Sequence, residues 1–145
     1  MKVELSYDRA GSRLHRIGEV ELSYDRAGNR PKRLGHLDLD YDMVGNRLRQ
    51  VGADVIEYDM LGNRPVRFGN LGLEYDRLGG RLRRIGDTVI DYDRAGSRVR
   101  RIGDATIDYD RMGSRPRYLV VDNTSQLDEL SVLVFLVLVA FDPEH

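Results

Sequence analysis

A seventeen-residue repeat constrains this chain more than any other feature of its sequence. It is marked by a tyrosine followed by an aspartate, at Tyr7, Tyr24, Tyr41, Tyr58, Tyr75, Tyr92 and Tyr109. A glycine four residues after each tyrosine and an arginine six residues after it complete the pattern, with no slip over seven copies. A fixed short period indicates stacked supersecondary units that share one core.

One unit has the pattern of two strands, as residues 87–103 (DTVIDYDRAGSRVRRIG) illustrate. The segment 89–93 alternates apolar and polar residues, which is typical of a half-buried strand. Arg94-Ala95-Gly96 has the pattern of a three-residue hairpin loop, with glycine in the left-handed conformation. A second strand is expected over 97–102, and Gly103-Asp104 fits a two-residue type II′ turn to the next unit.

Both strands have a predicted core face. On the first strand it carries each tyrosine and the apolar residue two places before it, such as Leu5 before Tyr7. On the second strand the apolar residues are three apart, as in Leu14 and Ile17, a spacing that a regular strand would send to opposite faces. Three units have proline in the slot of Leu14: Pro31, Pro65 and Pro116. Both observations predict a bulge in the second strand.

Seven such pairs give a meander of 14 strands over residues 1–121, and we predict that it closes. A long open meander leaves two bare edges, which promote aggregation and which closure removes. Fourteen strands at roughly 4.8 Å spacing and about 40° tilt give a radius of about 14 Å, too wide for strand side chains alone to fill.

The tail, residues 122–145, is predicted to be a hydrophobic helix that fills this lumen. Gln126 to Phe141 is preceded by Ser125, which forms a capping-box pattern with Asp128, and Pro143 follows the run. A helix that is apolar on all sides is either buried or in a membrane. Its uncharged stretch is shorter than the roughly 20 residues of a membrane span, which favours burial.

The predicted fold is therefore all-β with one helix: a 14-stranded antiparallel meander rolled into a closed barrel around a hydrophobic C-terminal helix. The alternative is an open, curved sheet with the helix laid over one face. Either fold forms one domain with a modest core.

Composition narrows the classes of partner. The formal net charge is -1, and residues 76–117 carry 11 basic and 7 acidic side chains, an excess too small and too interleaved for a nucleic-acid interface. The chain has no cysteine, which excludes a disulfide framework and a thiolate metal site. The N-terminus already has the pattern of a strand and not of a signal peptide. A cytoplasmic location is the default expectation, with non-classical export as the alternative.

The motif in Tyr24–Arg30 (YDRAGNR) and in Tyr58–Arg64 (YDMLGNR) resembles the YD repeats of RHS proteins, teneurins and shell-forming components of insecticidal toxin complexes. The resemblance covers about residues 3–121. It implies a β-sheet that spirals into a hollow shell, which in that family often encloses a C-terminal toxin segment, and some members are implicated in carbohydrate contact. This unit is shorter and more uniform, and no self-cleaving aspartate region is recognisable near Asp142-Pro143.

Several residues of the repeat are candidates for a binding site. The tyrosine stripe is predicted to be core and not a sugar platform, and each repeat arginine is predicted to pack on a tyrosine ring and pair with an aspartate of an adjacent unit. Asp38, Asp40 and Asp42 have calcium-loop spacing but lack the later glycine and glutamate of an EF-hand. The histidines show no metal spacing and are expected at the surface: His15, His36 and His145.

These observations favour a non-enzymatic structural or encapsulating module. No catalytic, cofactor-binding or metal residue is assigned, because no nucleophile arrangement, phosphate loop or acid pair stands out from the repeat. We expect a monomer with no cofactor, no nucleic-acid partner and no small-molecule substrate. One alternative is a binding module for glycans or a partner protein, and another is a membrane-active fragment that inserts its tail.

Overall fold

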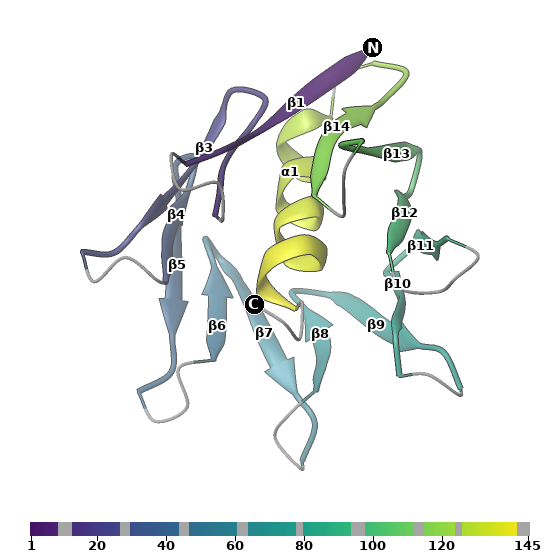
Figure 1. Ribbon diagram of the computed structural model, residues 1–145. Coiled ribbons are helices and arrows are strands. Elements are labelled where there is room, and N and C mark those ends of the chain that lie inside the picture. Colours follow the sequence, from purple (N-terminus) through teal and green to yellow (C-terminus); the bar gives the residue numbers. More distant parts are fainter. Residues whose placement is uncertain are drawn as a thin grey trace.

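The protein forms a closed barrel with a helix inside it (Figure 1). The structure is a computed structural model and describes residues 1–8, 13–26, 30–43, 47–60, 64–77, 80–93, 98–111, 115–123 and 126–141. Each strand is antiparallel to its neighbours in sequence, and the last strand pairs with the first. The predicted closed barrel around a C-terminal helix is confirmed, and the open-sheet alternative is wrong.

Each unit contributes one strand that ends at its tyrosine and one that follows its loop. The tyrosine-bearing strands are β1 (Lys2–Tyr7), β3 (Val20–Tyr24), β5 (Leu37–Tyr41), β7 (Asp54–Tyr58), β9 (Leu71–Tyr75), β11 (Thr88–Tyr92) and β13 (Ala105–Tyr109). The second strands are β2 (Leu14–Ile17), β4 (Pro31–Leu34), β6 (Leu48–Val51), β8 (Pro65–Phe68), β10 (Leu82–Ile85), β12 (Val99–Ile102) and β14 (Pro116–Val120). The second strands are thus shorter than predicted.

Every hairpin within a unit carries a bulge in its second strand. In the first unit Tyr7 lies opposite Leu14 while the residue before Tyr7 lies opposite Arg16, so His15 is the extra residue. The same register shift occurs in the other units. Because the bulge adds one residue between them, the side chains of Leu14 and Ile17 point to the same face of the sheet. Both are buried despite their spacing of three. The predicted bulge is confirmed.

Two-residue turns join one unit to the next, as predicted. Gly18, the first residue of the first such turn, has φ 60°, a left-handed conformation that glycine adopts without steric cost. Its amide donates to the carbonyl of Glu4 at 2.8 Å, which continues the β1–β2 ladder into the turn. The other five turns of this kind have the same glycine geometry.

The predicted three-residue loop Arg94–Gly96 lies outside the described residues, and so do at least the last two residues of every other loop of this kind. The residues that flank each loop are joined by a hydrogen bond from the aspartate amide to the arginine carbonyl, as from Asp93 to Arg98 at 2.9 Å. This bond brings the aspartate and arginine of one unit together across their own loop.

Two stacked apolar rings form the inner wall. One consists of Leu5, Leu22, Leu39, Ile56, Leu73, Ile90 and Ile107, and the other of Ile17, Leu34, Val51, Phe68, Ile85, Ile102 and Leu119. Each of these side chains is at most 8% exposed, which confirms the predicted core face. A third ring, near the two-residue turns, is uneven: Val3 and Ala105 are buried, whereas Asp54 and Leu71 are exposed. The buried members lie on β1 and β13, on either side of β14, which the helix follows.

The C-terminal helix occupies the interior (Figure 1). It runs as α1 (Leu127–Phe135) and continues as a π-helical turn, η1 (Leu136–Ala140). Val134, Phe135 and Leu136 have no exposed area and belong to the same core as the wall. Valine is a weak helix former, so burial of the apolar surface sustains this helix more than intrinsic propensity does.

The start of the helix differs from the predicted capping box. Gln126 occupies the N-cap position, and its side chain makes no capping hydrogen bond. Ser125 and Pro143, which the sequence marked as end signals, lie outside the described residues. Asp128 and Glu129 lie in the first turn, at the positive end of the helix dipole, but both are exposed, so water and salt screen this interaction.

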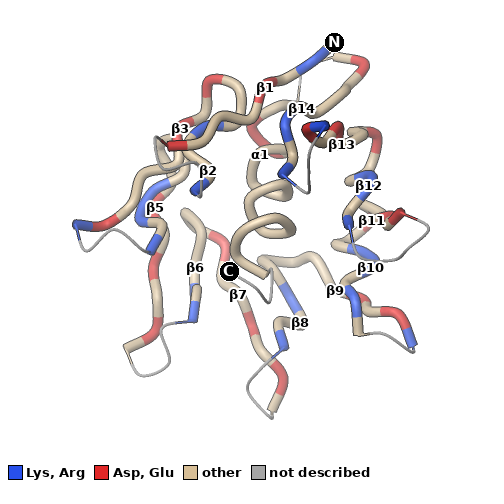
Figure 2. The backbone as a smooth tube through the Cα atoms, in the orientation of Figure 1, with Lys and Arg blue, Asp and Glu red and all other residues tan. Residues whose placement is uncertain are grey.

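Acidic and basic residues are interleaved along the wall, as the colours of the backbone tube in Figure 2 show. Two pairs illustrate the pattern: Arg33 lies 3.6 Å from Asp38 on the next strand, and Arg83 lies 3.5 Å from Glu74. These pairs are exposed, so each contributes about 0–1 kcal/mol. The outer face therefore favours solubility more than it favours stability.

Candidate functional site

The most distinctive polar arrangement is a ring of Asp–Arg–Tyr contacts that follows the barrel wall. We call it the Asp–Arg–Tyr ring. Its tyrosines are those of the repeat, from Tyr7 to Tyr109. Its aspartates are Asp8, Asp25, Asp42, Asp59, Asp76, Asp93 and Asp110, and its arginines are Arg13, Arg30, Arg47, Arg64, Arg81, Arg98 and Arg115. Each tyrosine ends a first strand, and each arginine precedes a second strand.

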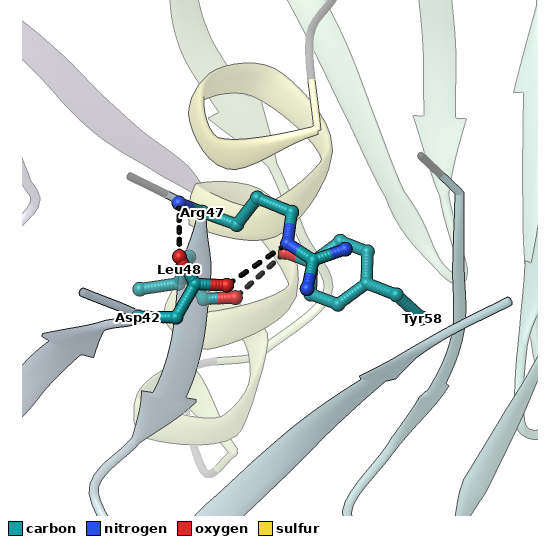
Figure 3. Close-up of polar contacts among 4 residues, drawn as sticks. All are labelled: Asp42, Arg47, Leu48 and Tyr58. Carbon is teal, nitrogen blue, oxygen red and sulfur yellow. Dashed lines mark hydrogen bonds and ion pairs between the residues drawn. The ribbon is translucent and has the colours of Figure 1, made fainter. Parts of the chain in front are cut away.

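Figure 3 shows one link of the ring. Arg47 Nε donates to Asp42 Oδ2 at 2.9 Å, and the Arg47 backbone amide donates to Asp42 Oδ1 at 3.2 Å. The Arg47 guanidinium carbon lies 4.2 Å from the ring centroid of Tyr58, in the next unit. The Tyr58 hydroxyl donates to the carbonyl of Leu48 at 2.6 Å. One arginine thus joins the aspartate of its own unit to the tyrosine of the next.

The arginine–tyrosine contact of this link recurs around the barrel. In all seven units the guanidinium lies 4.0–4.5 Å from the following tyrosine ring. The last link crosses from the seventh unit to the first: Arg115 stacks on Tyr7 at 4.5 Å, and the Tyr7 hydroxyl donates to Pro116 O at 2.7 Å. The ring is therefore continuous through the β14–β1 pairing.

Proline suits the acceptor position of this link. The hydroxyls of Tyr7, Tyr41 and Tyr75 donate to the carbonyls of prolines, and proline retains a carbonyl although it lacks an amide donor. The strand slot beside the bulge supplies a carbonyl whatever side chain it carries. This explains why Leu14 and the prolines are interchangeable there.

Six of the ring tyrosines have a pKa raised above the ordinary value of 10, so these six are neutral over the physiological range. Burial raises the pKa of four of them to about 12: Tyr7, Tyr24, Tyr41 and Tyr75. Burial also raises the pKa of Tyr58 and Tyr92. The stacked arginine acts in the opposite direction, but desolvation is the larger effect.

This geometry suits mechanical linkage better than chemistry. The described hydroxyls already donate to backbone carbonyls, and their raised pKa disfavours the phenolate that a nucleophile or a base would require. The stacked guanidinium covers one face of each tyrosine. The link is not fully closed to solvent, since the Arg47 side chain is 40% exposed.

One shallow cavity of about 280 Å³ adjoins the ring. Its lining combines ring residues of two units with neighbouring strand residues: Asp76, Arg81, Arg83, Ile90, Asp91, Tyr92 and Asp93. Both charges are present, so the cavity has no strong preference for a ligand of one sign.

The structure corrects the predicted partner of each arginine. We expected the arginine to pair with an aspartate of an adjacent unit, but Arg30 pairs with Asp25, and Arg81 with Asp76, within one unit. The reason is the loop closure described above, which places these two residues side by side. The neighbouring unit is reached through the tyrosine instead. The tyrosines lie on the predicted core face, but they are half-buried at its edge.

The remaining candidate residues are dispersed. Asp38 pairs with Arg33 and Asp42 with Arg47, while Asp40 is exposed. His15 lies 3.9 Å from Glu21, and His36 is exposed in a turn. His145 lies outside the described residues. Within the part of the chain that the structure describes, no group of three or more His, Asp or Glu side chains is placed to hold a metal ion.

Comparisons of the chain with protein-family models, with curated proteins and with solved structures gave no match. The resemblance to YD repeats therefore stays a prediction from the motif. Among the described residues, no helix is both long and apolar enough to span a membrane.

The sequence did not identify the backbone carbonyls that accept the tyrosine hydroxyls. A carbonyl is present at every residue, so no side-chain pattern marks it. The proline substitutions in the Leu14 slot were the available signal, because they show that the side chain there matters less than the backbone.

Proposed function

We propose that this chain is a non-enzymatic structural module of the YD-repeat kind, an encapsulating shell whose lumen is filled by its own tail. The wall is residues 1–121, and the filling is residues 122–145. The observation that carries the proposal is the complete burial of Val134, Phe135 and Leu136 within the core of the wall. A wall that encloses an apolar segment and keeps it from water is what we expect of an encapsulating shell.

The use of the polar groups also supports a structural role. Each described link of the Asp–Arg–Tyr ring joins one unit to the next through an arginine stacked on a tyrosine, such as Arg47 on Tyr58, and through a tyrosine hydroxyl that donates to a backbone carbonyl. An enzyme would require a polar group available to react with a substrate. Burial raises the pKa of Tyr7 and Tyr41 to about 12, which disfavours the phenolate that a tyrosine base or nucleophile would need. We therefore propose no catalytic residue, no cofactor and no nucleic-acid partner, and a monomer as the working form.

A binding module for glycans or a partner protein is the second candidate. The cavity beside Tyr92 and the partly exposed side chain of Arg81 favour it. Isothermal titration and a glycan array test this candidate directly. Saturable binding that Arg81→Ala removes would establish it, while absence of binding to every glycan would leave only the partner protein.

The encapsulating proposal is tested by removing the filling. We would compare the full chain with residues 1–121 by chymotrypsin digestion and light scattering, since chymotrypsin cleaves after the Leu and Phe residues of the tail. The full chain is expected to be a resistant monomer, and the truncated chain to unfold or aggregate because its apolar lining meets water. Full-length Glu129→Gln, with an exposed substitution in the helix, is the matched control and should behave like the parent.

Two outcomes would contradict the proposal. A truncated chain that stays folded and monomeric would show that the wall closes without the tail. Rapid cleavage within residues 127–141 of the full chain would show that the tail spends time outside the barrel, and liposome leakage would then be the next measurement.

A further inference from the structure

We infer that the first unit, β1 with β2, can be exchanged between two copies of this chain, giving a swapped homodimer held by the β14–β1 pairing. The partner is a second copy, and the interface is the one that closes the monomer. The inference stands apart from the proposed function, because it uses only the register of the wall and the contacts of its first unit.

The first step is that the β14–β1 pairing has the same register as the strand pairs that join neighbouring units elsewhere in the wall. Val3 lies opposite Leu119, and one unit earlier Ala105 lies opposite Ile102. Adding seventeen to Ile102 and Ala105 gives residues 119 and 122. At the closure, Val3 takes the place of residue 122, because the two positions are seven repeats apart and therefore equivalent. The register at the closure is thus the register of the repeat, although no peptide turn connects the two strands there.

The second step is that both boundaries of the first unit use the same interchangeable contacts. At one boundary Arg115 stacks on Tyr7, whose hydroxyl donates to a carbonyl of β14. At the other, Arg13 stacks on Tyr24 at 4.2 Å, and Tyr24 donates to the carbonyl of Leu14 at 2.7 Å. A first unit from a second copy offers the same groups in the same order. Exchange therefore preserves every contact except those of the connecting turn.

The third step concerns that turn. The first unit is joined to the remaining wall by one covalent connection, the two-residue turn Gly18-Glu19. Short connections favour exchange, because they become extended hinges in the swapped form. This turn is also crowded, since a Cβ added to Gly18 would lie 2.9 Å from Val3 Cγ1 at φ +60°. A side chain there strains the closed turn and should favour the extended hinge.

The fourth step is that exchange keeps the lumen intact. Each barrel of the swapped dimer still has seven units and one helix, so no apolar surface is newly exposed. A ring of fourteen units would be twice as wide, and its helices would not fill it. The swapped dimer and the monomer then differ in hinge strain and in association entropy, which makes the dimer dependent on protein concentration.

Disulfide trapping tests the inference, because the chain has no native cysteine. Lys2 and Val120 are Cα partners across the β14–β1 pairing. We would prepare Lys2→Cys and Val120→Cys as separate chains, mix them, unfold them in urea, refold them at high concentration and oxidise. Exchange predicts a mixed disulfide between the two chains in the dimer fraction. Lys2→Cys mixed with Arg49→Cys, an exposed residue of β6, is the matched control and should cross-link only at chance level.

The double variant Lys2→Cys/Val120→Cys, oxidised at low concentration, checks that the two cysteines pair within one chain. Light scattering after refolding gives an independent readout: Gly18→Ala should raise the dimer fraction several-fold over the parent. Gly72→Ala, where an added Cβ meets nothing within 4 Å, should leave it unchanged. Absence of dimer from Gly18→Ala at high concentration overturns the inference. So does a dimer in which Lys2→Cys cross-links to Arg49→Cys as readily as to Val120→Cys.

Discussion

The wall and the helix of this barrel are stabilised in different ways. In the wall, each unit repeats the same few contacts, namely a buried pair such as Leu5 with Ile17 and one polar link to the next unit. The helix has no repeat, and its stability comes from burial of individual side chains, with Phe135 at 0% exposure. The wall therefore distributes its stability over many similar contacts, and the helix concentrates it. A condition that acts on every unit should therefore destabilise the wall, whereas a single substitution should be enough to destabilise the packing of the helix.

Alkaline pH should produce the largest effect, because it acts on the ring tyrosines together. The pKa of Tyr7 and Tyr41 is about 12 in the folded state against 10 for the free side chain. Between these values the unfolded chain loses protons that the folded chain retains, so stability is full below about pH 10 and falls as pH rises to about 12. We expect the barrel to unfold in this window, with tyrosinate absorbance and loss of circular dichroism following one curve.

Tyr118 provides the control for this experiment, since it lies outside the ring and contacts Lys2 and Arg117. Tyr118→Phe should leave the midpoint of the alkaline transition unchanged. Ionisation of most tyrosines near pH 10 with the circular dichroism intact would contradict the assignment of the ring to a desolvated environment.

Phe135→Ala should produce the largest effect of any single substitution discussed here. Removing a fully buried aromatic side chain leaves a cavity, and such changes lower the free energy of unfolding by about 3–5 kcal/mol. Urea unfolding of the full chain measures it, with Glu129→Ala on the exposed side of the helix as the control, expected within about 0.5 kcal/mol of the parent. A loss below about 1 kcal/mol would show that the helix is loosely packed and that the wall alone maintains the fold.

The sequence predicted the wall better than it predicted the links between its units. Strands, bulges and the core face follow from side-chain period, because a half-buried strand must alternate and a spacing of three must be corrected. The position of the helix followed from the width of a 14-strand barrel together with the apolar character of residues 130–141. Both are arguments from volume and burial, which the amino-acid types determine directly.

The route of the Arg–Tyr links did not follow from the sequence. With a strict repeat, equivalent aspartates and tyrosines occur in the arginine's own unit and in both neighbouring units, so the pattern alone cannot choose between them. The choice is made by loop closure, which places Asp42 beside Arg47 and directs the guanidinium to Tyr58. The group that accepts the tyrosine hydrogen bond could not be predicted either, because it is the main-chain carbonyl of Leu48 and no side-chain pattern marks it. The positions of these groups in the folded chain therefore determine which aspartate and which tyrosine each arginine contacts.

The smallest predicted effect tests whether the β14–β1 closure is as strong as a junction within the chain. Tyr7 and Tyr41 are closely matched: each donates to a proline carbonyl, at 2.7 and 2.6 Å, and each carries a guanidinium at 4.5 and 4.4 Å. Tyr7→Phe and Tyr41→Phe each remove one partly buried hydrogen bond, which lowers the free energy of unfolding by about 1 kcal/mol.

If the register and the side-chain contacts are what join the units, the two losses in urea unfolding should agree within about 0.5 kcal/mol, although only one junction also has a connecting turn. A clearly smaller loss for Tyr7→Phe would mean that the closure is already frayed in solution and that the turn contributes to the strength of the other junctions. A clearly larger loss would mean that the closure depends on its hydroxyl because no turn supports it. Equal losses would place the strength of this wall in its repeated contacts and not in its connectivity.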